Sequence, residues 1–182
     1  MADLTTLAAV KAYAGVVGSA DDASLQSLIT AYSAYVQQWM NRQILTASYT
    51  NTFSGKNNTA QMLPQYPVTA VSAVTVDGVA IPARTTPTGM GYFFDDDSVV
   101  LSGYTFSKGR SNVSISYTAG YATVPAEIAQ AVNELVGLRY ALKDKQGWSS
   151  KTLAGETVSL ITGDMPSSVK TILGNWKAVV PL

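Results

Sequence analysis

The chain has 182 residues, 47% hydrophobic and 13% charged, and its 12 basic and 12 acidic side chains cancel at neutral pH. Soluble proteins carry about 25% charged residues, so much of the surface of this chain must be uncharged. An uncharged surface suits burial against neighbouring subunits. A monomer with a Ser/Thr-rich surface is the alternative. The zero net charge argues against a broad basic face that holds nucleic acid. The absence of cysteine and histidine excludes disulfides, thiolate nucleophiles, histidine triads and the usual zinc sites.

The N-terminal part predicts two helices, over residues 4–14 and 22–42. Thr5 or Thr6 can cap the first helix, and two aspartates open the second, where a carboxylate faces the positive end of the helix dipole. Apolar residues recur at helical spacing through the second helix for over four turns. Its aromatic residues, Tyr32, Tyr35 and Trp39, follow that spacing, which favours a place in the core.

The middle of the chain, residues 47–117, predicts a small, mostly antiparallel β-sheet inserted between helical ends. Thr, Val and aromatic residues alternate there with turn residues, and Asp77-Gly78 is a strong hairpin signal. The expected strands are 47–53, 61–63, 68–76, 79–81, 92–94, 99–101 and 113–117. Gly120, in the turn that leads to the next helix, is expected to need a conformation open only to glycine.

A third helix is predicted over residues 125–146, because Pro125 is favoured at a helix start and Glu127 lies in the first turn. Residues 148–163 are polar and irregular with one possible strand, and a last short helix begins near Pro166. The fold class is therefore α+β, with a helical frame around an inserted sheet. We expect a main domain over residues 1–147 and a C-terminal extension over residues 148–182.

One acidic run, Asp95, Asp96 and Asp97, is a weak candidate for a metal site, because neighbouring carboxylates can bind Ca²⁺ or Mg²⁺. Adjacent residues of an extended chain point in opposite directions, so an acidic turn between two strands is the favoured interpretation. No nucleotide-binding motif is present. We therefore expect no enzyme activity and no cofactor; a carboxylate enzyme or a Ca²⁺-binding module is the alternative.

Four residues near the C-terminus are candidate partner contacts: Trp148, Trp176, Lys143 and Lys145. Tryptophan anchors interfaces well, although burial in the chain's own core is an equal alternative for both tryptophans. The lysines belong to a mild basic excess after Arg139, which a solvated helix face explains as well as a partner does. No apolar run reaches the roughly 18 residues that cross a bilayer, so no membrane partner is expected.

Three stretches of the chain form a recognisable series. The first is LTTLAAVKAYAGV followed by DDASLQSLITAYSAYVQQWMNRQI, a short helix, an aspartate-rich break and a long helix. The second is MLPQYPVTAVSAVTVDG, and the third is VSISYTAGYATVPAEIAQAVNELVGLRY. In this order they resemble the head–tail connector family of tailed phages and gene transfer agents, also called head-completion or adaptor proteins. The three together cover roughly residues 4–142. The chain departs from many members after Leu142, and it continues for about 40 residues.

The resemblance implies a structural subunit of the phage neck at the head–tail junction of the virion, assembled in the host cytoplasm. Its partners would be further copies of itself in a ring, commonly twelve-fold, the portal protein, and the next connector or a tail-terminator protein. Genomic DNA would pass through the ring without sequence-specific binding. A tail-completion or tail-terminator protein of the same neck is the alternative, since it would share the size, the charge and the lack of catalytic groups.

Overall fold

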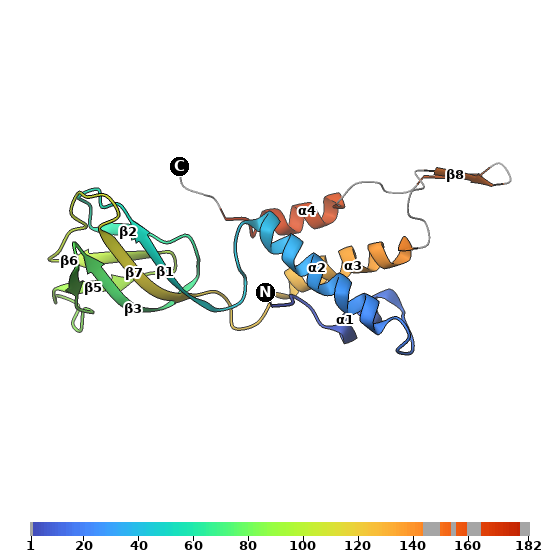
Figure 1. Ribbon diagram of the computed structural model, residues 1–182, viewed down its shortest axis with the longest axis horizontal. Coiled ribbons are helices and arrows are strands. Elements are labelled where there is room, and N and C mark those ends of the chain that lie inside the picture. The colour runs from blue at the N-terminus through green and yellow to red at the C-terminus, as the bar shows by residue number, and fades with distance from the viewer. Residues whose placement is uncertain (1, 144–149, 154–155, 160–164, 179–182) are drawn as a thin grey trace. The chain divides into compact units, whose positions relative to one another are not determined.

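The computed structural model describes residues 2–143, 150–153, 156–159 and 165–178, and the chain divides into two compact units (Figure 1). The helical unit combines the residues up to Asn41 with Val124–Val179. The sheet unit spans Arg42–Thr123. The α+β fold predicted from the sequence is confirmed, and the strands lie between helices in the chain as expected.

Four helices and one hairpin make up the helical unit, and their bounds differ from the predicted ones by a few residues. The elements are α1 (Leu7–Ala14), α2 (Asp22–Met40), α3 (Ala126–Ala141), the paired strands β8 (Ser150–Leu153) and β9 (Glu156–Ser159), and α4 (Ser167–Gly174). Helix α1 begins at Leu7 because the Thr6 hydroxyl accepts a hydrogen bond from the backbone N–H of Ala9 at 3.2 Å. Helix α2 ends where Asn41 adopts a left-handed conformation, with φ 55°.

Helices α2 and α3 each pack on the other three helices, so the two together form the centre of the helical unit. The fully buried apolar side chains come from all four: Val10, Leu25, Ile29, Val36, Met40, Ile128, Ala131, Val132, Val136, Val169 and Leu173. Two buried polar residues fix the N-terminal segment on this core. The Ser33 hydroxyl accepts a hydrogen bond from the N–H of Leu4 at 2.9 Å, and the Thr5 hydroxyl donates to Asn133 at 2.6 Å.

The sheet unit contains two antiparallel sheets, whereas the sequence predicted one. The first has the order β1-β7-β3-β4 and the second has the order β2-β6-β5. Their bounds are β1 (Ala47–Phe53), β2 (Ala60–Met62), β3 (Val68–Val76), β4 (Val79–Ile81), β5 (Gly91–Phe94), β6 (Ser98–Ser102) and β7 (Val113–Ala119). Which strands pair depends on contacts between residues far apart in the chain, and the alternation within each strand does not encode it.

One apolar cluster, to which both sheets contribute, is the core of the sheet unit, and Tyr117 is its largest fully buried side chain. Burial raises the pKa of the Tyr117 phenol to about 12, and its hydroxyl donates to Asn51 at 2.9 Å. The Tyr92 hydroxyl of β5 donates to the carbonyl of Val71 in β3 at 3.1 Å and so joins the sheets. The β3–β4 turn forms as predicted, with positive φ at Asp77 and Gly78.

Within the described ranges, no helix is both long and apolar enough to cross a membrane.

Candidate assembly surfaces

The three aspartates that were the metal candidate form the turn between β5 and β6. Their side chains are exposed, while their backbone is tied into the sheet unit: the carbonyl of Asp96 accepts from Val68 N–H at 2.7 Å, and that of Asp97 from Leu63 N–H at 2.8 Å. Among the residues that the structure describes, no three acidic side chains gather closely enough to hold a metal ion. The three aspartates thus occupy an acidic turn between two strands, and their role as a metal site stays an untested prediction.

Lys143 follows α3 and makes contacts within the helical unit. Its ammonium lies 3.3 Å from a carboxylate oxygen of Asp21, the residue before α2, and 3.3 Å from the hydroxyl of Tyr140. The Tyr140 hydroxyl donates to the other oxygen of Asp21 at 2.6 Å. Asp21 thus links the start of α2 to the end of α3. From the sequence, its carboxylate was expected only to face the positive end of the dipole of α2. Lys143 remains exposed, so a partner can still reach it.

This contact predicts a pH dependence of the helical unit. The hydrogen bond from Tyr140 and, second, the one from Lys143 hold the pKa of Asp21 below its ordinary 3.8. A lowered pKa means that the carboxylate stabilises the fold above pH 3.8, and that this stabilisation is lost as the pH falls through the lower, folded-state pKa. We expect Asp21→Asn to melt below the wild type at pH 7 and to match it in strong acid. An equal difference at both pH values would contradict the assignment.

Of the two tryptophan candidates, Trp176 follows α4, while Trp148 lies outside the described residues, as does Lys145. The Trp176 indole N–H donates to a carboxylate oxygen of Glu127, in the first turn of α3, at 3.0 Å. The ring is partly buried, so Trp176 both fastens the chain after α4 to α3 and keeps part of its surface in solvent. Its role as a partner contact stays a prediction.

The aromatic residues of α2 do not lie in the core, and that expectation was wrong. Tyr35 is 36% exposed, and Tyr32 and Trp39 are only partly buried. The two tyrosine rings meet edge to face at 6.2 Å, and the ammonium of Lys177 lies 4.9 Å from the Trp39 ring centre. The small and polar Ser33 and Gln37 take the buried positions beside Val36 instead. Spacing alone could not separate the two helix faces, because both carry apolar side chains.

A surface that sequence reasoning did not single out is the outer edge of β1. Strand β1 pairs with β7 over its whole length, from Ala47 opposite Ala119 to Phe53 opposite Val113. No backbone hydrogen bond joins β1 to any other described strand or loop. The backbone N–H and carbonyl groups of β1 that point away from β7 can therefore form hydrogen bonds with an added strand.

A family model described as "Head completion protein" matches residues 3–179, nearly the whole chain. The chain belongs to the head completion protein family. The resemblance seen in the three sequence stretches is thereby confirmed, and the match favours head completion over the alternative of a tail-terminator protein. Head completion proteins are structural components of the virion neck.

Solved structures of gene transfer agent particles contain chains with the same fold. A chain from the neck of an empty particle, computed with C6 symmetry, is 23% identical with a TM-score of 0.62; 98% of this chain and 92% of that chain are covered. A chain from a native virion is 21% identical with a TM-score of 0.60 and the same coverage. A third, from a native neck with C12 symmetry, is 19% identical with a TM-score of 0.59, covering 100% and 96%. No curated protein matches the chain.

Proposed function

We propose that this head completion protein forms a ring beneath the portal, which connects the capsid to the tail and gives the genomic DNA a channel. The observation that carries the proposal is the family match over residues 3–179. The protein is assembled from the host cytoplasm into the head–tail junction. Its neighbours there are copies of itself, the portal protein, and the next connector or tail-terminator protein.

The two compact units support a ring, because a closed ring needs two different faces on each subunit that meet head to tail. A helical unit and a sheet unit with unlike surfaces supply such faces. The neck structures of gene transfer agent particles that contain the similar chains were computed with C6 or C12 symmetry. We propose a twelve-fold ring on the same pattern, with Lys143 and Trp176 as candidate contacts to the portal or the tail side.

A neutral chain also suits a DNA channel. Each lysine or arginine that binds a phosphate adds affinity and releases counterions, and a ring held to DNA in this way would resist its passage. The chain has equal numbers of basic and acidic side chains, 12 of each. DNA is therefore expected to move through the ring without sequence-specific binding.

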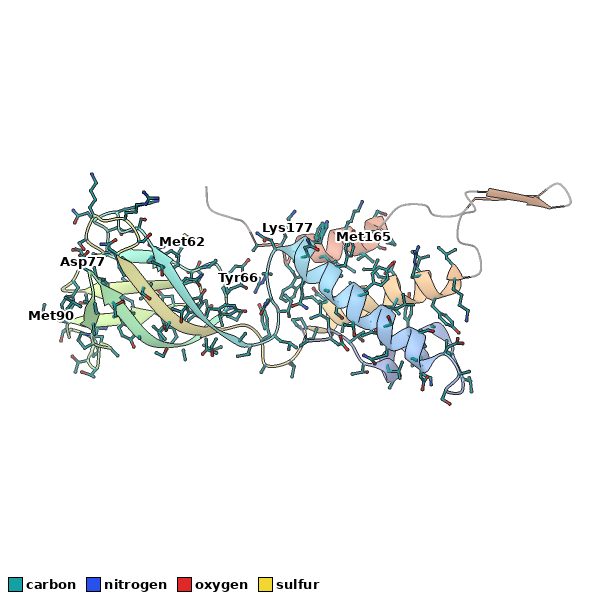
Figure 2. The ribbon with its side chains drawn as sticks, in the orientation of Figure 1. Met62, Tyr66, Asp77, Met90, Met165 and Lys177 are labelled. Carbon is teal, nitrogen blue, oxygen red and sulfur yellow. The ribbon has the colours of Figure 1, made fainter. Side chains whose placement is uncertain are left out.

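We propose that α4 belongs to the connector domain rather than to a separate extension. Val169 and Leu173 of α4 are fully buried in the helical unit, and Met165 before it is 4% exposed. Figure 2 labels Met165 beside the helices. The N–H of Ala178 donates to the carbonyl of Met40 at 2.9 Å, so the chain after α4 returns to the end of α2. Such burial is typical of a helix that completes a core.

Deletion of the gene in a producing host tests this role. We expect DNA-filled heads and complete tails that fail to join, because the ring between them is missing, and restored joining when the wild-type chain is supplied in trans. Electron micrographs of the lysate give the result. Tails of irregular, increased length beside normal heads would assign the chain to tail termination and contradict the proposal.

A further inference from the structure

Strand β1 is an edge strand without the usual protection. It is seven residues long, Ala47–Phe53, and contains no charged residue, no proline and no glycine. Its register with β7 shows no bulge, in contrast to the β3–β7 pairing, which shifts at two places. Proteins normally shorten, charge, bend or cover such an edge, because an unprotected one recruits a further strand. The edge of β1 is therefore open to pairing with a strand from another chain.

The remaining sheet edges are protected. Strands β2 and β4 are three residues long, and a proline follows each within two residues, at Pro64 and Pro82. Strand β5 is covered by the preceding loop, because Tyr92 N–H donates to the carbonyl of Pro82 at 2.9 Å and its carbonyl accepts from Arg84 N–H at 2.8 Å. Strand β3 pairs with β4 only from Val74 onward. Before that point, the N–H of Val68 donates to the carbonyl of Asp96, and the carbonyl of Val71 accepts from the Tyr92 hydroxyl. In the described part of the sheet unit, β1 is therefore the long edge whose backbone makes no such further contact.

The β8–β9 hairpin is a two-stranded sheet that a further strand would stabilise. Its two strands pair from Ser150 opposite Ser159 to Leu153 opposite Glu156. Among the helices and strands that the structure describes, neither strand packs closely on any element except the other. An isolated two-stranded hairpin is marginally stable in water, and a third strand is usually required. Each strand is four residues long and so fits within the seven-residue edge of β1.

We infer that the β8–β9 hairpin of one copy pairs with the β1 edge of the next copy in the ring. One strand of the hairpin pairs with β1, so the hairpin's two strands extend the four-stranded sheet β1-β7-β3-β4 to six strands across the subunit boundary, a form of β-strand addition. Because every copy carries one open edge and one hairpin, the pairing propagates head to tail and closes as a ring. This inference rests on the ring proposed above and specifies its subunit contact.

Cysteine cross-linking tests the contact directly, because the chain has no native cysteine. Thr50 lies at the middle of β1 with an exposed side chain, and Thr152 and Thr157 oppose each other in the hairpin. The full-length double variants Thr50→Cys/Thr152→Cys and Thr50→Cys/Thr157→Cys cover pairing through either strand. The matched controls carry cysteine at Ala73 instead of Thr50, because Ala73 is exposed in the same row of the sheet but on the interior strand β3.

Purified necks are treated with a bis-maleimide that spans about 8 Å, the distance between diagonal neighbours on paired strands. We expect a ladder of covalent oligomers on a denaturing gel for one of the two Thr50 variants, and at least about tenfold less for the Ala73 controls. A cross-linked monomer without a ladder would mean that the hairpin pairs within its own chain. Intact rings without cross-links would mean that the hairpin binds elsewhere, for instance on the portal. Either result overturns the inference while the proposed function stands.

A charge on the edge gives an independent test. Lysine is a natural device against edge pairing, so Thr50→Lys is expected to lower the fraction of chain recovered in necks by at least about tenfold, with a melting temperature close to that of the wild type. The control Ala73→Lys adds the same charge on an interior strand and is expected to stay within about twofold of the wild type. Equal assembly of both variants would contradict pairing at β1.

Discussion

The Gly120→Val variant is expected to lose the sheet unit, or to melt at least about 12 °C below the wild type. Gly120 has φ 115°, a conformation that residues with a side chain rarely adopt. A Cβ atom there would lie 2.7 Å from the carbonyl oxygen of Leu45 and 2.9 Å from the N–H nitrogen of Thr46. Both obstacles are backbone atoms, so no side-chain rotation relieves them. Strain and collision together cost about 3 kcal/mol or more, which in a small domain is roughly 12 °C.

The backbone around Gly120 explains why the collision cannot be relaxed. The N–H of Gly120 donates to the carbonyl of Pro67 at 2.9 Å, and the next residue, Tyr121, exchanges two hydrogen bonds with the segment after α2: its N–H donates to Ile44 at 2.8 Å, and its carbonyl accepts from Thr46 at 3.0 Å. Moving the two segments apart would break these bonds, each worth about 1 kcal/mol.

Alanine substitutions at two glycines distinguish the effect of the collision with a new Cβ atom from the effect of the strained backbone conformation. Gly78 also has a positive φ, 79°, but a Cβ added there meets no atom within 4 Å. We expect Gly78→Ala to cost about 1 kcal/mol and Gly120→Ala clearly more, as measured by thermal unfolding followed by circular dichroism. Equal losses at the two glycines, or a stable Gly120→Val protein, would show that the turn is not constrained as described.

Truncation of the chain after Gly147 is expected to unfold the helical unit. Without the structure, such a truncation would be expected to leave a folded domain that fails to join the neck, with loss of solubility as the sign that the tail completes the core. The structure favours the second outcome, because Val169 and Leu173 of α4 are fully buried. The truncation also removes the hydrogen bond from Trp176 to Glu127. We expect most of the helical signal at 222 nm to be lost, while the sheet unit persists.

A point substitution makes the same test without removing the hairpin. Leu173→Ala leaves a cavity in the helical core and is expected to cost about 2–5 kcal/mol. Lys170 lies in the same helix and is exposed, so Lys170→Ala is the matched control and should change the free energy of unfolding by less than about 0.5 kcal/mol. Denaturant titration measures both, and a Leu173→Ala protein as stable as its control would place α4 outside the core.

Local chemistry in the sequence was enough to predict most elements. The hairpin at Asp77-Gly78 and the strand Val68–Val76 were predicted, and so was a cap at Thr5 or Thr6, which the structure assigns to Thr6. Turn residues, alternation and capping act over a few neighbouring positions, so the sequence is enough to predict them. Gly120 was also readable as a special turn residue. The hairpin, the strand and the cap depend on a few neighbouring residues, whereas the close approach of Leu45 to Gly120 comes from a distant segment of the chain.

What the sequence could not predict depends on contacts between distant segments. The division into two sheets follows from which strands pair, and the outward position of Tyr35 follows from α3 packing on the opposite face of α2. The open edge of β1 was hidden for the same reason, because a strand is an edge only when no other strand pairs with it. Of the candidate contacts, Lys143 and Trp176 proved to bond within the helical unit, which composition could not reveal.

A reconstruction of the particle neck by cryo-electron microscopy tests the central claim most directly. The chain's two units should fit into density between the portal and the tail as a ring of identical subunits, commonly twelve, around an open channel. Density that places this chain elsewhere, for instance along the tail tube, would contradict the proposal that this head completion protein forms the connecting ring.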